Sequence, residues 1–358
     1  MSKKTSWRTI GRGSWCALLG AMMFSACGGS DAERTSTEAS QSSSPSVESE
    51  PTDRAATADG AGWYACTTEG KTCSFVGTRM VRYGADGKYA YKSATKSVPC
   101  TSDVFGDPAP GVAKTCSISS TPSPYLQDAA QYTLTFRDEF SGTTLDASKW
   151  NDHIVHVPAS DADDYGVSNG FLKIWPQADS TGEFKSRILT TYQKFSQAYG
   201  YFEMEAKLPV GRGLWPAFWL LNSDSPPGEP EIDIMEAYPG DDTGYWADSN
   251  HHPIRFEASF YEKGNGQENS KNGNKPLETV DLSAGFHKYA VKWEPNKVSY
   301  YFDGKLFYSA DVSMSRPMYL LVDIQYGNNN PSGNVDSTTP LGPDNSLQVN
   351  YIRAWQLK

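Results

Sequence analysis

The sequence predicts an all-β protein, and three observations support this prediction. From residue 131 to 358 the chain consists of short alternating or apolar runs separated by Gly, Pro, Asn and Asp. These runs show no long stretch with the 3.6-residue period of a helix. The preceding segment, residues 62–120, contains four cysteines and a strand pattern around a tight turn. We therefore expect a β-sandwich or barrel that follows a small disulfide-stapled β module.

Composition limits the function before any motif is considered. The chain has 358 residues, 32 Lys and Arg against 42 Asp and Glu, and a net charge of −10, with 38% hydrophobic residues. This composition supports a packed core, and the absence of a basic run excludes nucleic acid as a partner, because a phosphate backbone requires clustered cations. Aromatic residues make up 13%, including 20 Tyr and 10 Trp, which favours a carbohydrate partner.

Residues 1–27 are predicted to be a lipoprotein signal peptide. Four basic residues without an acidic one precede an apolar run over residues 14–26, which is shorter than the roughly 20 residues that cross a bilayer. The run ends in Phe-Ser-Ala-Cys27, which resembles a bacterial lipobox and implies lipidation of Cys27. We expect an exported protein that contacts a membrane only through this anchor. Gly28 after the cysteine suggests an outer-membrane or cell-surface location.

Residues 28–61 are predicted to be a disordered linker. They are almost entirely Ser, Thr, Ala, Pro, Gly and acidic residues, so they bury too little apolar area to fold. A flexible tether of this length has an end-to-end distance of about 30 Å.

Residues 62–120 form the small module. The four cysteines Cys66, Cys73, Cys100 and Cys116 predict two disulfides in an exported protein, and three pairings remain open, of which Cys66–Cys73 with Cys100–Cys116 is the most local.

The module also carries a hairpin signal and a group of aromatic residues. Residues 78–92 alternate around an Asp-Gly pair, which predicts a β-hairpin. Trp63, Tyr83, Tyr89 and Tyr91 are candidates for a sugar-stacking face, or for the core of the module itself.

Three acids stand close together in the segment 231–236 (EIDIME) of the large domain. Alternate residues of a strand share a face, so Glu231 and Asp233 point together while Glu236 points away. A β-bulge at Ile234 or Met235 would bring Glu236 onto the same face. Clustered acids raise the pKa of at least one member, and glycoside cleavage requires such a protonated acid. The alternatives are an acidic strand face in solvent and a calcium site.

Two tryptophans lie just upstream of these acids. Trp215 and Trp219, in the segment GLWPAFWLL, are an even number of residues apart and so share one strand face. Indole rings on such a face stack on pyranose rings, and packing in the core is the alternative.

The large domain resembles glycoside hydrolase family 16, the laminarinase and lichenase group with a bulged ExDxxE strand. The resemblance runs from about Thr133 to Leu357 and rests on FRDEFSG, YGYFEMEAKLP, WPAFWLL, EIDIME and FHKYAVKW with YYFDG. It implies a jelly-roll catalytic domain over residues 130–358, with a sugar cleft and a retaining double displacement that uses no metal.

The resemblance also assigns site residues. It implies that Glu231 is the nucleophile, Glu236 the acid/base and Asp233 the residue that positions the nucleophile. Arg187, Asp323 and Gln325 match positions that face the sugar. Some relatives hold a structural calcium on the convex side, where Glu139 fits a ligand position but Asn350 replaces an Asp.

The expected function is that of a monomeric endo-β-glucanase that cleaves β-1,3 or mixed β-1,3-1,4 linkages in a polysaccharide. Hydrolysis of galactans of the agarose or carrageenan type and transglycosylation are alternatives within the same family. A non-catalytic surface protein that binds polysaccharide is an alternative of a different class.

Overall fold

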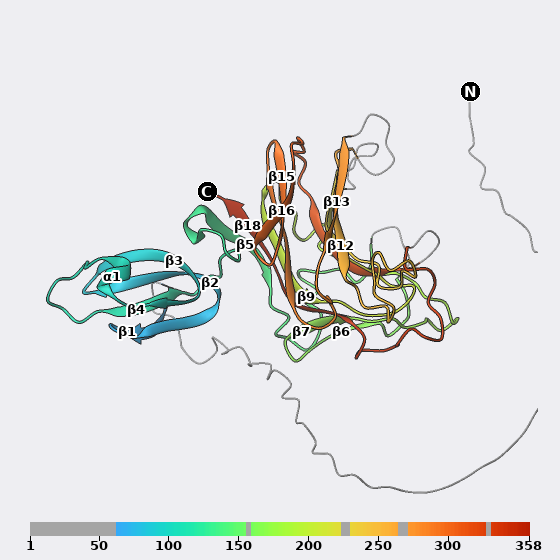
Figure 1. Cartoon of the computed structure of the whole chain (residues 1–358), viewed down its shortest axis with the longest axis horizontal. Coiled ribbons are helices and arrows are strands. Elements are labelled where there is room, and N and C mark those ends of the chain that lie inside the picture. The colour runs from blue at the N-terminus through green and yellow to red at the C-terminus, as the bar shows by residue number, and fades with distance from the viewer. Residues whose placement is uncertain (1–61, 155–158, 223–229, 264–270, 327–330) are drawn as a thin grey trace, which may run out of the picture. The chain divides into compact units, whose positions relative to one another are not determined.

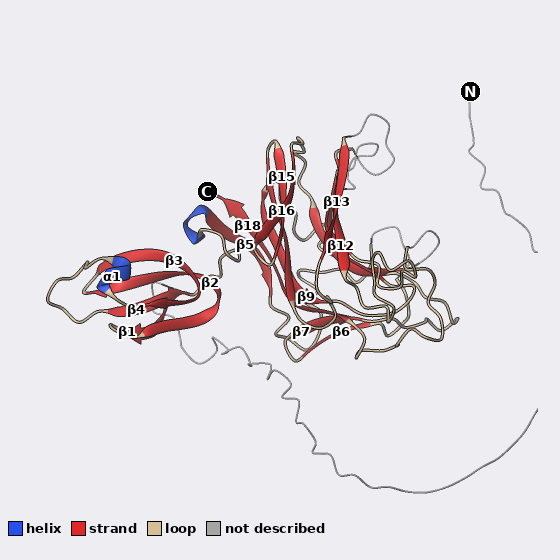
Figure 2. Cartoon of the chain, viewed as in Figure 1, coloured by secondary structure: helices blue, strands red, loops and turns tan. Residues whose placement is uncertain are grey.

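The computed structural model describes residues 62–154, 159–222, 230–263, 271–326 and 331–358. Strands dominate these residues (Figure 2), and the helices among them are only the four-residue α1 (Ser102–Phe105) and a 3₁₀ turn at Ala129–Gln131. The all-β prediction is confirmed. No helix in the described ranges is long and apolar enough to cross a membrane. The predicted signal peptide, Cys27 and the linker lie outside the described residues.

The small module is one antiparallel sheet. Its strands are β1 (Trp63–Thr68), β2 (Thr72–Ala85), β3 (Lys88–Pro99) and β4 (Thr115–Ser119), in the order β1-β4-β2-β3 (Figure 1). The predicted hairpin joins β2 to β3, where Ala85 pairs with Lys88. Asp86 and Gly87 both have positive φ, as a two-residue turn between twisted strands requires.

The cysteines of the module form the two local disulfides. Cys66 bonds to Cys73 and Cys100 bonds to Cys116, which selects one of the three pairings that the sequence left open. Cys73, Cys100 and Cys116 are fully buried with Phe75 in a small core. Such cross-links stabilise a domain that is too small to bury a large core.

The large domain is a sandwich of two antiparallel sheets. The six-stranded sheet has the order β13-β12-β11-β10-β17-β8. Its strands are β8 (Arg187–Thr190), β10 (Trp215–Leu221), β11 (Glu231–Glu236), β12 (Arg255–Tyr261), β13 (Asn272–Glu278) and β17 (Tyr319–Gln325).

The second sheet has eight strands and packs against the first (Figure 1). Its order is β16-β15-β14-β9-β18-β7-β6, and β5 pairs with the long β18. The strands are β5 (Tyr132–Asp138), β6 (Tyr165–Ser168), β7 (Phe171–Ile174), β9 (Gly200–Lys207), β14 (His287–Glu294), β15 (Lys297–Phe302), β16 (Lys305–Ala310) and β18 (Leu347–Leu357).

One face of the six-stranded sheet packs against the core between the sheets, and the other face points away from that core. Phe218, Leu220 and Ile232 lie in the same buried cluster as Phe202 and Trp293 of the eight-stranded sheet. Alternate residues of β10, β11, β12 and β17 therefore point to the opposite side, which we call the open face. The polar residues of these strands gather on the open face.

Candidate active site

A bulge in β11 places three carboxyl groups on the open face. Phe218 of β10 pairs with Met235 and Trp219 pairs with Asp233, so Ile234 has no partner in β10. The same irregularity interrupts the pairing of β11 with β12 between Asp233 and Glu236. Because one residue is inserted, Glu236 returns to the face of Asp233 while Ile234 and Met235 are both buried in the core. The predicted bulge is confirmed.

One serine hydroxyl links two of these acids. Ser259 of β12 pairs with Asp233, and its Oγ lies 3.1 Å from Asp233 Oδ2 and 3.1 Å from Glu236 Oε2. A hydroxyl has a single hydrogen, so both contacts are hydrogen bonds only when one of the two carboxyls is protonated and donates. The geometry of the cluster therefore holds a proton between these acids.

The electrostatics of the cluster agree with this geometry. Burial raises the pKa of the Asp233 carboxyl well above its usual range, and the charges of Glu236 and Glu231 act in the same direction. The hydrogen bond between Asp233 and Glu231 also raises this pKa, so Asp233 is the donor and Glu231 the acceptor.

Glu236 is a second group that holds its proton near neutral pH. Burial raises the pKa of Glu236 to about 7, and the negative charges of Glu231 and Glu257 add to this increase. The hydrogen bond from Trp215, whose Nε1 donates to Glu236 Oε1 at 3.1 Å, acts against this increase. The cluster thus contains an acid that is still partly protonated at neutral pH.

A tyrosine of the eight-stranded sheet contacts the backbone beside the bulge of β11. Tyr300 of β15 is fully buried, and its hydroxyl donates to the backbone carbonyl of Ser259 at 2.5 Å. This contact lies where the bulge interrupts the ladder of β11 and β12. A buried carbonyl without a partner is costly, so Tyr300 stabilises the irregular backbone on which the acids depend.

The two predicted tryptophans lie on the same face as the acids. Trp215 pairs with Gln325 of β17, and Ala217, two residues further along β10, pairs with both Glu236 and Asp323. Trp215, Trp219 and Gln325 are half-buried on the open face. The structure therefore brings three of the five predicted substrate-binding residues to the acids with part of their surface accessible.

Asp323 is beneath this surface and not part of it. Its side chain is fully buried, with 0% exposed, and it accepts a hydrogen bond of 2.7 Å from Trp219 Nε1 and a further one from Gln325. Burial raises the pKa of this carboxyl well above its usual range. The expectation that Asp323 faces a sugar is corrected here: its contacts orient Trp219 and Gln325.

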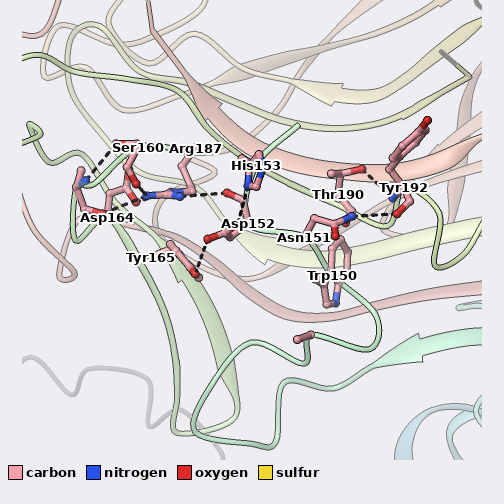
Figure 3. A network of polar contacts seen from close by, with 12 residues as sticks. Trp150, Asn151, Asp152, His153, Ser160, Asp164, Tyr165, Arg187, Thr190 and Tyr192 are labelled. Atoms are coloured by element: carbon pink, nitrogen blue, oxygen red, sulfur yellow. Dashed lines mark hydrogen bonds and ion pairs between the residues drawn. The ribbon is translucent and has the colours of Figure 1, made fainter. Parts of the chain in front are cut away.

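Arg187 also has a role different from the predicted one (Figure 3). Its guanidinium is 3% exposed, and its Nε donates to Asp164 Oδ1 at 2.6 Å. The remaining nitrogens donate to the backbone carbonyls of residues 152, 160 and 162 at 2.9–3.1 Å. These contacts use the donors that a sugar would need, so Arg187 holds the segment before β6 in place and does not line the open face.

Three open-face residues of β12 were not predicted from the sequence. Glu257 pairs directly with Glu236, Ser259 with Asp233 and Tyr261 with Glu231. The segment RFEASFY alternates these residues with buried Phe256, Ala258 and Phe260. This period of two indicates that the three residues share one face of the strand.

The residues on which the calcium expectation rests have other partners. Arg353 donates to both carboxyl oxygens of Glu139, at 2.9 and 2.6 Å, and Asn350 donates to Glu205 at 2.6 Å. In the part of the chain that the structure describes, no group of three His, Cys, Asp or Glu side chains is arranged as a metal site. Bound calcium stays a prediction.

Comparison with known proteins relates this geometry to a family. Residues 131–357 match the family model described as "Beta-porphyranase A-D, GH16 domain". Among relatives, the Endo-1,3-1,4-beta-glycanase EglC of Rhizobium meliloti (strain 1021) is 32% identical over 229 residues, which cover 60% of this chain and 45% of EglC. The Keratan-sulfate endo-1,4-beta-galactosidase of Sphingobacterium multivorum is 26% identical, with 70% of this chain and 61% of the relative covered.

A solved structure gives the same result for the fold. The catalytic domain of an endo-1,3-beta-glucanase (laminarinase) from Thermotoga petrophila RKU-1 has a TM-score of 0.51 and 25% identity, over 63% of this chain and 98% of that one. This likeness and the two packed sheets confirm the expected jelly-roll sandwich. The chain spans about half the length of the glycanase relatives it matches.

The raised pKa of Glu236 predicts a pH-dependent gain of stability in the variant Glu236→Gln. The folded protein binds this proton more tightly than the unfolded chain, whose pKa is near 4.5, so the parent loses stability as the pH rises from about 4.5 through 7. Glutamine carries no charge. We expect nearly equal melting temperatures at pH 4, below both pKa values, and a variant more stable by about 1–3 kcal/mol at pH 8.

Thermal unfolding at the two pH values, followed by calorimetry, measures this difference. Glu278→Gln is the matched control, because that side chain lies on β13, two strands from β11, and is 72% exposed, so its ion pair with Arg255 contributes little to stability. A variant Glu236→Gln that is less stable than the parent at pH 8 contradicts the proposed electrostatics, as does an equal gain at both pH values.

Proposed function

The chain belongs to glycoside hydrolase family 16, and on that premise we propose that it is a retaining endo-β-glucanase that cleaves β-1,3 or mixed β-1,3-1,4-glucan. The observation that supports the chemistry most strongly is the group of three acids on the open face, in which Asp233 donates to Glu231 and Ser259 bridges Asp233 to Glu236. This arrangement supplies a carboxylate and a protonated acid side by side, as a double displacement requires.

The contacts of each acid determine its role. Glu231 accepts a hydrogen bond from Asp233, which stabilises the carboxylate, so Glu231 is the nucleophile. Glu236 has a pKa of about 7 and holds its proton at neutral pH, so Glu236 is the acid/base. Asp233 positions Glu231 and lowers the repulsion among the three groups by staying protonated.

The reaction then has two steps. A carboxylate oxygen of Glu231 attacks the anomeric carbon while Glu236 gives its proton to the glycosidic oxygen, and the bond between carbon and leaving oxygen breaks. In the second step Glu236, now ionised, takes a proton from water as the water oxygen attacks the glycosyl ester. Glu231 leaves as a carboxylate, and the anomeric configuration is retained. Interception of the ester by a sugar hydroxyl would give transglycosylation.

Relatives support glucan as the substrate. The laminarinase of Thermotoga petrophila is named as an endo-1,3-beta-glucanase, and the relative from Rhizobium meliloti is named for cleavage of 1,3-1,4-beta linkages. An acidic protein of net charge −10 also favours a neutral polymer over a polyanion.

A galactan is the second candidate substrate, and a specific observation favours it. The matching family model carries the name of porphyranases, and one relative is named for cleavage of keratan sulfate. The two candidates share the mechanism above and differ in the sugar that Trp215, Trp219 and Gln325 contact. A non-catalytic surface protein is the third candidate, and the three intact acids count against it.

We expect Glu231→Gln and Glu236→Gln to lower hydrolysis at least a thousandfold while the unfolding transition stays cooperative, because the first variant lacks the nucleophile and the second lacks the proton donor. The measurement is the product profile of the protein on laminarin, lichenan, agarose and carrageenan. Short oligosaccharides from a glucan support the main proposal, and products from galactans alone replace its substrate. Activity of either variant near that of the parent contradicts the assignment of roles.

We also propose that the enzyme is a monomer anchored in the bacterial envelope by a lipid on Cys27. The support is the basic start, the short apolar run and the Ser-Ala-Cys27-Gly28 junction. Growth of expressing cells with a labelled fatty acid is expected to label the parent, whereas Cys27→Ala carries no label and leaves the membrane fraction. An unlabelled parent, or a Cys27→Ala variant that keeps the label, rejects the anchor.

A further inference from the structure

The sheet of the small module has one face that its own core does not use. Pairing of β2 with β3 and β4 sets Arg82 opposite Tyr91 and Ser117, and Ala65 of β1 is opposite Ser117 as well. Two residues away along their strands, Trp63 and Tyr89 point in the same direction. We call Trp63, Arg82, Tyr89 and Tyr91 the aromatic face.

The core of the module lies on the other side of this sheet. Val81 and Tyr83 are fully buried there, together with Ile118 and with Cys73, Cys100 and Cys116. Tyr83 is therefore a core residue, and its inclusion among the candidate sugar-stacking rings is corrected. Tyr91, by contrast, is 59% exposed, and Trp63 and Tyr89 are half-buried. The rings of the aromatic face are not needed to fill the core.

The aromatic face is ordered by contacts within itself. The guanidinium of Arg82 lies over the Trp63 ring at 4.8 Å and over the Tyr89 ring at 4.5 Å, so the cation separates and holds both rings. The rings of Trp63 and Tyr91 are 5.8 Å apart between centroids and are inclined by 52°. The sheet beneath them carries the small residues Ala65 and Ser117. A ligand thus meets rings whose orientation is already fixed, which lowers the entropic cost of binding.

The chemistry of this face suits a polysaccharide. The C–H side of a pyranose stacks on an aromatic ring, while tyrosine hydroxyls and the arginine offer polar groups at the rim. The module has seven basic residues against four acidic ones. One of the seven, Lys114, is buried in ion pairs with Glu69 and Asp107, so the remaining cations outnumber the remaining acids. This balance tolerates neutral and sulfated sugars alike.

We propose that the aromatic face is a second polysaccharide-binding site, separate from the three acids of the large domain, and that it holds the polymer that the large domain cleaves. The proposal rests on the proposed function only for the choice of polymer. Two linked sites on one long chain raise the effective concentration of substrate at the catalytic residues, so the benefit is expected on long or insoluble polymers and not on short oligosaccharides.

The test uses the full chain with Glu231→Gln, so that no polymer is consumed. Trp63→Ala and Tyr91→Ala are added singly, and depletion on insoluble curdlan and agarose, with affinity electrophoresis in lichenan and carrageenan, gives the binding constants. We expect each substitution to weaken binding at least tenfold on one class of polymer. Tyr91→Ala protects the test against misfolding, because a ring that is 59% exposed contributes little to the core. The polymer affected distinguishes a neutral glucan from a sulfated galactan.

Phe286→Ala is the matched control, because this ring is 37% exposed and stacks on Phe171 of the large domain, so it belongs to no part of the aromatic face. Its binding constants are expected to equal those of the parent. With Glu231 restored, Trp63→Ala and Tyr91→Ala should cleave short oligosaccharides at the parental rate and insoluble polymer more slowly.

Unchanged binding of both module variants on all polymers overturns the proposal. A change in self-association at sedimentation equilibrium, without a change in polymer binding, also overturns it and assigns the face to a second copy of the chain. Failure of the proposed function has a different signature, because the parent then cleaves none of the polymers whether or not the aromatic face binds them.

Discussion

The candidate site depends on a single extra residue in β11. Without the bulge between Asp233 and Glu236, alternation would turn Glu236 into the apolar core. With it, Ile234 and Met235 are both buried and the three acids share the open face. The inserted residue interrupts the ladder with β12, and Tyr300 reaches through the core to the carbonyl of Ser259 at that level. The packing of one sheet on the other thus maintains the backbone that the chemistry requires.

The same arrangement gives similar carboxyl groups different protonation. Burial and mutual repulsion oppose three negative charges on one short strand, so protons remain on Asp233 and Glu236. The hydrogen bonds then distribute the roles, because Asp233 donates to Glu231, and Ser259 and Trp215 contact Glu236. A second buried acid, Asp323, accepts a hydrogen bond from Trp219 Nε1 and so fixes the orientation of that indole ring. Polar groups below the open face therefore set both the proton positions and the orientation of the rings.

Much of this could be predicted from the sequence, and the failures have physical reasons. Strand parity and the cost of clustered acids predicted the bulge and the shared face of the tryptophans, whereas the cysteine pattern left three disulfide pairings open. Asp323 and Arg187 were assigned to sugar contacts from the resemblance of motifs, which does not reveal how deeply a side chain is buried, and both are buried among their own partners. Tyr83 was misplaced because a two-residue turn reverses parity between β2 and β3, where Tyr83 pairs with Ala90. Ser259 was missed because a serine in a strand carries no sign of two acids that come from another strand.

The central claim is that Glu236 is still partly protonated at neutral pH and that the hydrogen bond from Trp215 lowers its pKa. The pH dependence of kcat/KM, measured for the parent and for Trp215→Phe on the polymer that the parent cleaves, tests this claim most directly. The indole donor stabilises the carboxylate form, so its removal raises the pKa of Glu236. The account predicts a basic limb near pH 7 in the parent and a limb at higher pH in the variant. A basic limb far from pH 7, or one that stays in place or moves to lower pH in Trp215→Phe, would contradict it.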